Sequence, residues 1–144
     1  MYRVIVIVLL TMVACHSGKK EDQQAEWPEM ESFHKLMAQV YHPLSDSGNL
    51  EPAKHLMESL ANEATRWASA PLPEKVNTAE MKSAVEALRT GTEKLAAAIK
   101  QGVADDEIEL SLENLHAQFH KIMEEWNGED QEHEHMREQE EEHE

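Results

Sequence analysis

The chain has 144 residues, which is enough for one domain with flanking segments. It carries 29 Asp and Glu residues against 13 Lys and Arg residues, so it repels nucleic-acid phosphates and anionic lipid headgroups, and we expect neither as a partner. Leu, Ala and Met dominate the apolar residues and glycine is scarce, a composition typical of helices rather than sheets.

The first fifteen residues have the organisation of a bacterial export signal. Arg3 gives a basic start, and the uncharged apolar run 4–14 is shorter than the roughly 20 residues that span a membrane. Met12-Val-Ala-Cys15 resembles the lipobox of bacterial lipoproteins. The resemblance implies that residues 1–14 are a signal peptide and that Cys15 carries a lipid such as palmitate. It also implies an anchor in the cell membrane or outer membrane, with the rest of the chain in the periplasm or on the cell surface.

Cys15 is the single cysteine of the sequence, so a disulfide, a zinc–thiolate site and thiol catalysis are excluded from the remainder of the chain. Residues 15–27 are polar and unpatterned, and we interpret them as a flexible tether between the lipid and a folded domain.

The first two helices are predicted from their end signals. Pro28 suits a first helical turn, and the His42-Pro43 pair should end the first helix after Tyr41, since a residue before proline avoids the α conformation. The second helix follows Asn49 as its N-cap, tolerates Pro52 in its first turn and ends before Pro71.

The last two helices are predicted in the same way. Asn77 with Glu80 three residues later suggests the start of the third helix, and Gly102 suggests its end. The fourth helix begins near Asp105 and is expected to stop at Asn127-Gly128. All four segments carry apolar residues at a spacing of three and four, so residues 28–126 are predicted to form an all-α, antiparallel, up-down-up-down four-helix bundle.

Residues 127–144 form an acidic tail. Residues 129–144 hold nine acidic residues, one arginine and three histidines, and provide no apolar stripe for a core. We expect this tail to be disordered, with a frayed helical extension as the alternative.

Histidines border the apolar stripes of the first and fourth helices. His116 and His120 are four residues apart and share one face, which Met123 continues. His34 and Met37 share a face of the first helix, and an antiparallel register places His34 level with His120. His42 lies further along and is expected to join only if the chain bends at Pro43.

This group of side chains predicts a transition-metal site between the first and fourth helices. Imidazole suits copper, zinc and nickel, and thioether favours copper(I), so a mixed His and Met set favours copper, with zinc or nickel as alternatives. The predicted ligands are His34, His116 and His120, with Met37, His42 and Met123 as completing ligands.

The helix layout, with Pro52-Ala-Lys54 opening the second helix and Ala79-Glu-Met-Lys82 opening the third, resembles the periplasmic four-helix-bundle cytochrome b family. That family binds haem between a Met near the start of helix one and a His near the end of helix four, where this chain has His34 and His120. The resemblance therefore implies haem b with these two histidines as axial ligands. Covalent haem is excluded because the sequence has no Cys-x-x-Cys-His motif.

No catalytic constellation is evident in the sequence. It has no Ser-His-Asp arrangement, no glycine-rich phosphate loop and no second Glu-x-x-His to pair with Glu113 and His116 in a di-iron site. We therefore expect a lipid-anchored metal-binding protein and not an enzyme. The alternatives are a b-type haem protein and a non-catalytic interaction module.

Overall fold

The computed structural model describes the backbone of residues 26–141 and the side chains of residues 26–128. The signal segment, Cys15 and the tether up to residue 25 lie outside the described residues. The elements in chain order are α1 (Pro28–Ser47), α2 (Glu51–Ser69), the short 3-10 helix η1 (Glu74–Val76), α3 (Ala79–Lys100) and α4 (Asp105–Glu141). Residues 26–141 contain no strand, which confirms the prediction of an all-helical fold with four main helices.

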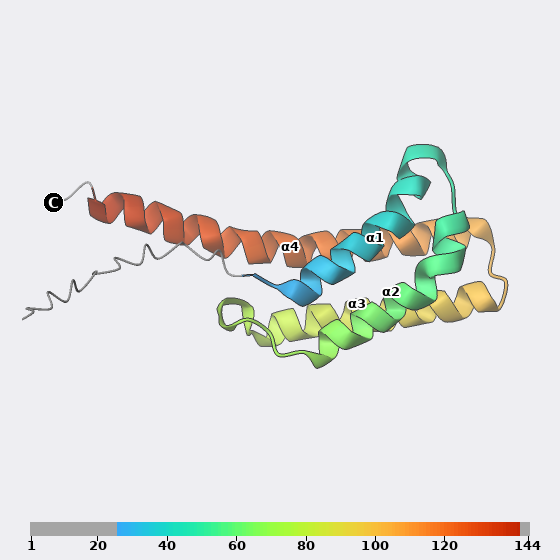
Figure 1. Cartoon of the computed structure of the whole chain (residues 1–144), viewed down its shortest axis with the longest axis horizontal. Coiled ribbons are helices and arrows are strands. Elements are labelled where there is room, and N and C mark those ends of the chain that lie inside the picture. The colour runs from blue at the N-terminus through green and yellow to red at the C-terminus, as the bar shows by residue number, and fades with distance from the viewer. Residues whose placement is uncertain (1–25, 142–144) are drawn as a thin grey trace, which may run out of the picture.

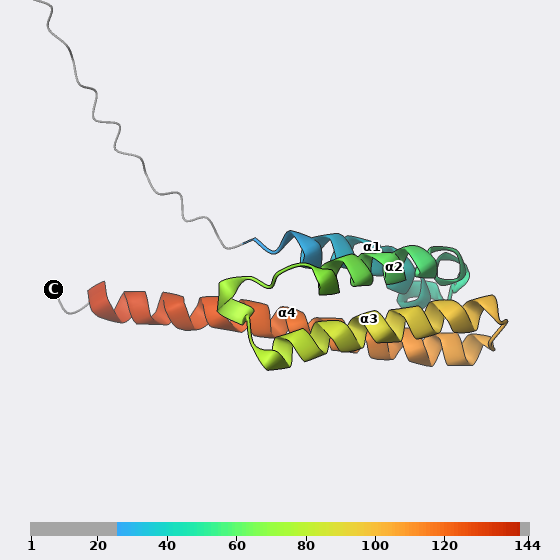
Figure 2. The same cartoon turned by 90° about the horizontal axis from the view of Figure 1, so that it is seen from below.

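The four helices lie alongside one another, and α4 extends beyond the ends of the other three (Figures 1 and 2). Their apolar stripes face inward and form one hydrophobic core. In the sequence, its first residue is Trp27 and its last is Trp126. Within residues 26–141, no helix is both long enough and apolar enough to cross a membrane.

Aromatic rings fill one end of this core. The ring of Trp27 contacts those of Trp67 and Trp126, with centroids 5.2 and 5.3 Å away. Phe33 and Phe119 continue the cluster toward the middle of the bundle, with their centroids 5.4 Å apart. Buried aromatic side chains bring large apolar areas out of water, so this end is expected to contribute strongly to stability.

The prediction that His42-Pro43 ends the first helix is wrong. α1 continues through Pro43 to Ser47 and buries Leu44 in the core. It ends at Gly48, which has a φ of 68° and donates its N–H to Leu44 O, while Asn49 N–H donates to Pro43 O. This paired capping satisfies the last carbonyls of the helix. The burial of Leu44 and the cap together outweigh the hydrogen bond that a proline cannot make.

The start of α3 lies one residue later than predicted. Thr78 is the N-cap, and its hydroxyl accepts a hydrogen bond from Met81 N–H at 3.0 Å, so the assignment of Asn77 as the cap is wrong. Asn77 instead lies at the end of η1, where its backbone N–H donates to Glu74 O. The intervening 3-10 turn, which the sequence pattern does not reveal, shifts the helix start.

The prediction that Asn127-Gly128 ends the fourth helix is also wrong. α4 continues through both residues to Glu141, so the helical alternative describes the backbone of the tail up to that point. Gly128 does not adopt a positive φ, the conformation in which glycine ends a helix. The glutamates that follow are good helix formers, which favours continuation.

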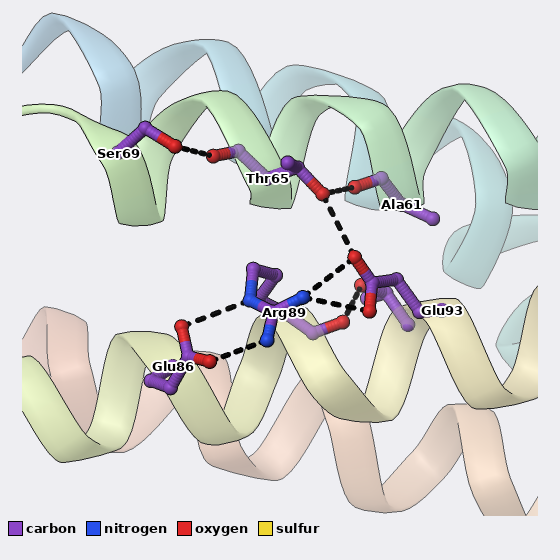
Figure 3. A network of polar contacts seen from close by, with 7 residues as sticks. Ala61, Thr65, Ser69, Glu86, Arg89 and Glu93 are labelled. Atoms are coloured by element: carbon purple, nitrogen blue, oxygen red, sulfur yellow. Dashed lines mark hydrogen bonds and ion pairs between the residues drawn. The ribbon is translucent and has the colours of Figure 1, made fainter.

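A polar network on the surface joins α2 to α3 (Figure 3). The guanidinium of Arg89 binds the carboxylates of Glu86 and Glu93 on its own helix, and the Thr65 hydroxyl donates to Glu93 at 3.1 Å across the gap between the helices. These carboxylates raise the pKa of Arg89, which therefore stays charged at any physiological pH. Exposed pairs of this kind contribute about 1 kcal/mol or less, so the network aligns the helices more than it stabilises them.

Candidate metal centre

The seam between α1 and α4 is defined by ring contacts. Trp27, directly before α1, meets Trp126 on α4, and further along the chain Tyr41 on α1 meets His116. Residue numbers rise along α1 as they fall along α4, so the two helices run in opposite directions. His34 lies against Phe119, one residue from its predicted partner His120, and the predicted register is therefore correct to within one helical turn.

His116 and His120 form a close pair on α4. Their Nε2 atoms are 3.2 Å apart, and the two rings meet edge to face with centroids 4.4 Å apart. Without a metal, this distance suits a hydrogen bond in which one neutral imidazole donates to the other. It also suits shared coordination, because two nitrogens each about 2.0 Å from one tetrahedral ion are about 3.3 Å apart.

The two remaining histidines of this region lie on α1. His34 and His42 are exposed and His116 and His120 are half-buried, so the cluster faces solvent along the seam. We call these four residues the seam histidines. Because α1 stays helical through Pro43, His42 lies two turns beyond His34, with Ala38 midway between them on the same helix.

The other three seam histidines act electrostatically on His116. Burial, followed by the charges of His120, His42 and His34 when protonated, lowers the pKa of His116 from 6.5 to about 4. The His116 imidazole is therefore neutral at pH 7. A neutral imidazole is the form that binds metal ions.

The two methionines of the predicted ligand set belong to the core. Met37 is fully buried, with 0% of its surface exposed, and Met123 is partly buried against the core cluster. Among the described residues, no group of three or more His, Cys, Asp or Glu side chains is arranged to hold a metal ion. The described geometry thus offers a pair of imidazoles at ligand spacing, with two further imidazoles nearby.

Tyr41 belongs to this region although the sequence reasoning did not include it. Its ring stacks on the imidazole of His116 with centroids 3.7 Å apart and an interplanar angle of 14°. Tyr41 is seven residues after His34, a spacing that returns to the same helix face. The same periodicity that selected the histidines therefore also indicates Tyr41.

His55 on α2 differs from the seam histidines. It is exposed, and its Nε2 lies 3.6 Å from a carboxylate oxygen of Glu51 one turn away on the same helix. This arrangement is typical of a surface histidine with no ligand role, which makes His55 a suitable control residue.

Comparisons with family models, curated proteins and solved structures give no match for this chain.

Proposed function

We propose that this protein is a lipid-anchored cell-envelope protein that binds a transition-metal ion at the seam between α1 and α4. The observation that carries the proposal is the 3.2 Å separation of the Nε2 atoms of His116 and His120, in a half-buried position flanked by His34 and His42. The antiparallel up-down-up-down order predicted for the helices is part of the proposal, since it makes α1 the neighbour of α4.

His116 and His120 are the anchoring ligands in this proposal. They lie on one face of a single helix, and their Nε2 atoms are at the spacing expected for two ligands of one ion. His34 or His42 completes the coordination by a change of side-chain rotamer, since both side chains are exposed. A solvent-facing site whose coordination is completed by a rotamer change suits uptake and release of a metal better than permanent structural binding.

Copper is the favoured ion, with zinc and nickel as alternatives. The burial of Met37 leaves imidazoles as the main donors, which removes the preference for copper(I) that a thioether would give. Among divalent ions, nitrogen donors bind copper(II) most tightly. Zinc and nickel follow, and the cell's supply of each ion then decides which one is bound.

The haem alternative has less support. His34 and His120, its two axial ligands, both contact the ring of Phe119, with centroids 5.2 and 6.2 Å away. Phe119 is fully buried and part of the aromatic cluster, so it occupies the space that a porphyrin would need between these two histidines.

The test is metal binding by the full-length chain without a His-tag. Histidines 16, 133, 135 and 143 lie outside the bundle, and we replace them with asparagine to give a bundle-only variant. We expect this variant to bind about one equivalent of copper(II) or zinc, and His116→Ala/His120→Ala to abolish the binding. His55→Asn is the matched control and should bind as the parent does.

Three results would overturn the proposal. The bundle-only variant could fail to bind copper, zinc or nickel, or the double variant could bind them as tightly as its parent. Alternatively, added haem could give a sharp Soret band that disappears in His34→Ala, which would establish the haem alternative instead.

The lipid anchor is tested separately in a bacterial expression host. We expect labelled palmitate to be incorporated into the wild-type chain and lost in Cys15→Ser. Incorporation that persists in Cys15→Ser, or is absent from the wild type, would contradict the anchor and leave the metal site unaffected.

A further inference from the structure

Tyr41 and His116 form the closest ring pair of the seam, and they come from different helices. The two rings are nearly parallel, with centroids 3.7 Å apart, and His116 also meets His120 edge to face, with centroids 4.4 Å apart. Tyr41 is partly buried and packs against the core, so its ring has packing contacts besides the one with the histidine. The imidazole of His116 therefore lies against a ring that other contacts also hold.

The stack restricts the rotation of His116 about its χ angles. An imidazole on an exposed helix face samples several rotamers, and binding a metal has to select one of them at an entropic cost. The flat contact with Tyr41 selects the orientation in which Nε2 of His116 points toward Nε2 of His120, 3.2 Å away. A ligand that is already ordered binds more tightly than one that becomes ordered on binding.

The stack is also stronger in the metal-bound state. Coordination draws electron density from the imidazole and makes its ring more positive, while the face of a phenol ring is negative. A contact that is stronger in the metal-bound state than in the metal-free state raises the affinity for the metal. A contact of equal strength in both states does not.

We propose that Tyr41 is a positioning residue for the metal site, which holds the His116 imidazole in the coordinating orientation without contacting the metal. This inference rests on the proposed metal-binding function and deepens it, because it assigns part of the affinity to a residue on the opposite helix.

The test compares two substitutions of Tyr41 in the bundle-only variant, with zinc as the probe. We expect Tyr41→Leu, which removes the aromatic face, to weaken zinc binding about three- to tenfold. Tyr41→Phe keeps that face and should stay within about twofold of the parent. Leu56→Ala truncates a partly buried side chain on α2, outside the seam, and controls for general loosening of the bundle. It should leave the affinity unchanged.

A second measurement covers the case in which Tyr41→Leu does not fold. The chain contains two tyrosines, Tyr2 and Tyr41, so tyrosine-labelled protein gives two sets of ring resonances in NMR spectra. We expect zinc to shift the Tyr41 resonances at one equivalent and to leave those of Tyr2 in place.

The outcomes separate this inference from the function on which it rests. If the bundle-only variant binds no metal, the proposed function is wrong. If it binds zinc through His116 and His120, but Tyr41→Leu binds equally well or the Tyr41 resonances do not move, the site stands and the role of Tyr41 is refuted.

Discussion

At the scale of single residues, the same side chain type serves different purposes in this protein. His55 is an exposed histidine beside a carboxylate, whereas His116 is half-buried, stacked on Tyr41 and surrounded by other imidazoles. Burial and like charges disfavour protonation of His116, and aromatic stacking orders its ring. The physical surroundings, and not the residue type, distinguish a candidate ligand from an ordinary surface histidine.

The lowered pKa of His116 predicts a pH-dependent stability. Its pKa is about 4 in the folded protein against 6.5 when unfolded, so between these values the unfolded chain binds more protons. The contribution of His116 to stability is therefore present above pH 6.5 and lost as the pH falls toward 4. From pH 7 to pH 5, we expect metal-free wild type to lose on the order of 1 kcal/mol more than His116→Asn in denaturant unfolding, after allowance for solvent screening.

The control for this experiment is His55→Asn, which removes a histidine outside the seam and leaves the surroundings of His116 unchanged. Stability curves of wild type and His116→Asn that stay parallel from pH 7 to pH 5 would show that His116 titrates alike in the folded and unfolded states.

At the scale of helices, end signals and close contacts decide where each element lies. The N-cap of α3 gives a direct test. Thr78→Ala removes the hydroxyl that accepts the Met81 N–H and should lower the free energy of unfolding by about 1 kcal/mol. Asn77→Ala is the matched control, since its side chain does not cap the helix, and it should cost clearly less. A larger loss in Asn77→Ala than in Thr78→Ala would assign the cap to Asn77 after all.

The approach of α3 to α4 depends on the absence of a side chain at Gly91. A Cβ atom built there lies 2.6 Å from Cδ2 of Leu115, which is buried in the core, whereas one built at Gly128 meets nothing within 4 Å. We expect Gly91→Val to overpack this contact and to cost about 1–3 kcal/mol in chemical denaturation. The same change at Gly128 introduces no clash. Equal stabilities of the two variants would mean that Leu115 moves aside freely.

At the scale of the whole molecule, the bundle and the acidic tail differ in composition. Trp126 is the last core residue among the described side chains. Lys75 of η1 donates to its backbone carbonyl at 3.1 Å and places its ammonium 3.4 Å from the centroid of its indole ring system. Beyond this point α4 projects past the other helices (Figure 1). The chain has a net charge of −16, and this last segment carries a large share of the negative charge.

This division predicts that the tail can be removed without loss of the fold. A chain that ends after Gly128 should unfold within about 2 °C of the full-length chain, because the core residues among the described side chains all precede the cut. Thermal unfolding followed by circular dichroism measures this, and the loss of helical signal per molecule reports the α4 extension. A drop of more than about 5 °C would mean that the tail packs on the bundle.

The sequence by itself determined the helical class, the number of main helices and the composition of their buried faces. These depend on the 3.6-residue repeat of apolar side chains, which is a local property of the sequence. The partnership of His34, His116 and His120 at one seam followed from the same repeat together with an antiparallel register. Cys15 and the signal segment were also read from sequence, and they remain predictions.

Only the tertiary structure decided where the helices end, that Met37 and Met123 pack in or against the core, and that Tyr41 lies beside His116. Pro43 stays inside α1 because the burial of Leu44 and the cap at Gly48 compensate for the hydrogen bond that proline cannot make. Sequence rules that consider one residue and its nearest neighbours do not include these contacts. Met37 and His34 lie on neighbouring positions of one face, yet one is in the core and the other in solvent. A rotation of α1 by a fraction of a turn separates these outcomes, and packing against three other helices fixes that rotation.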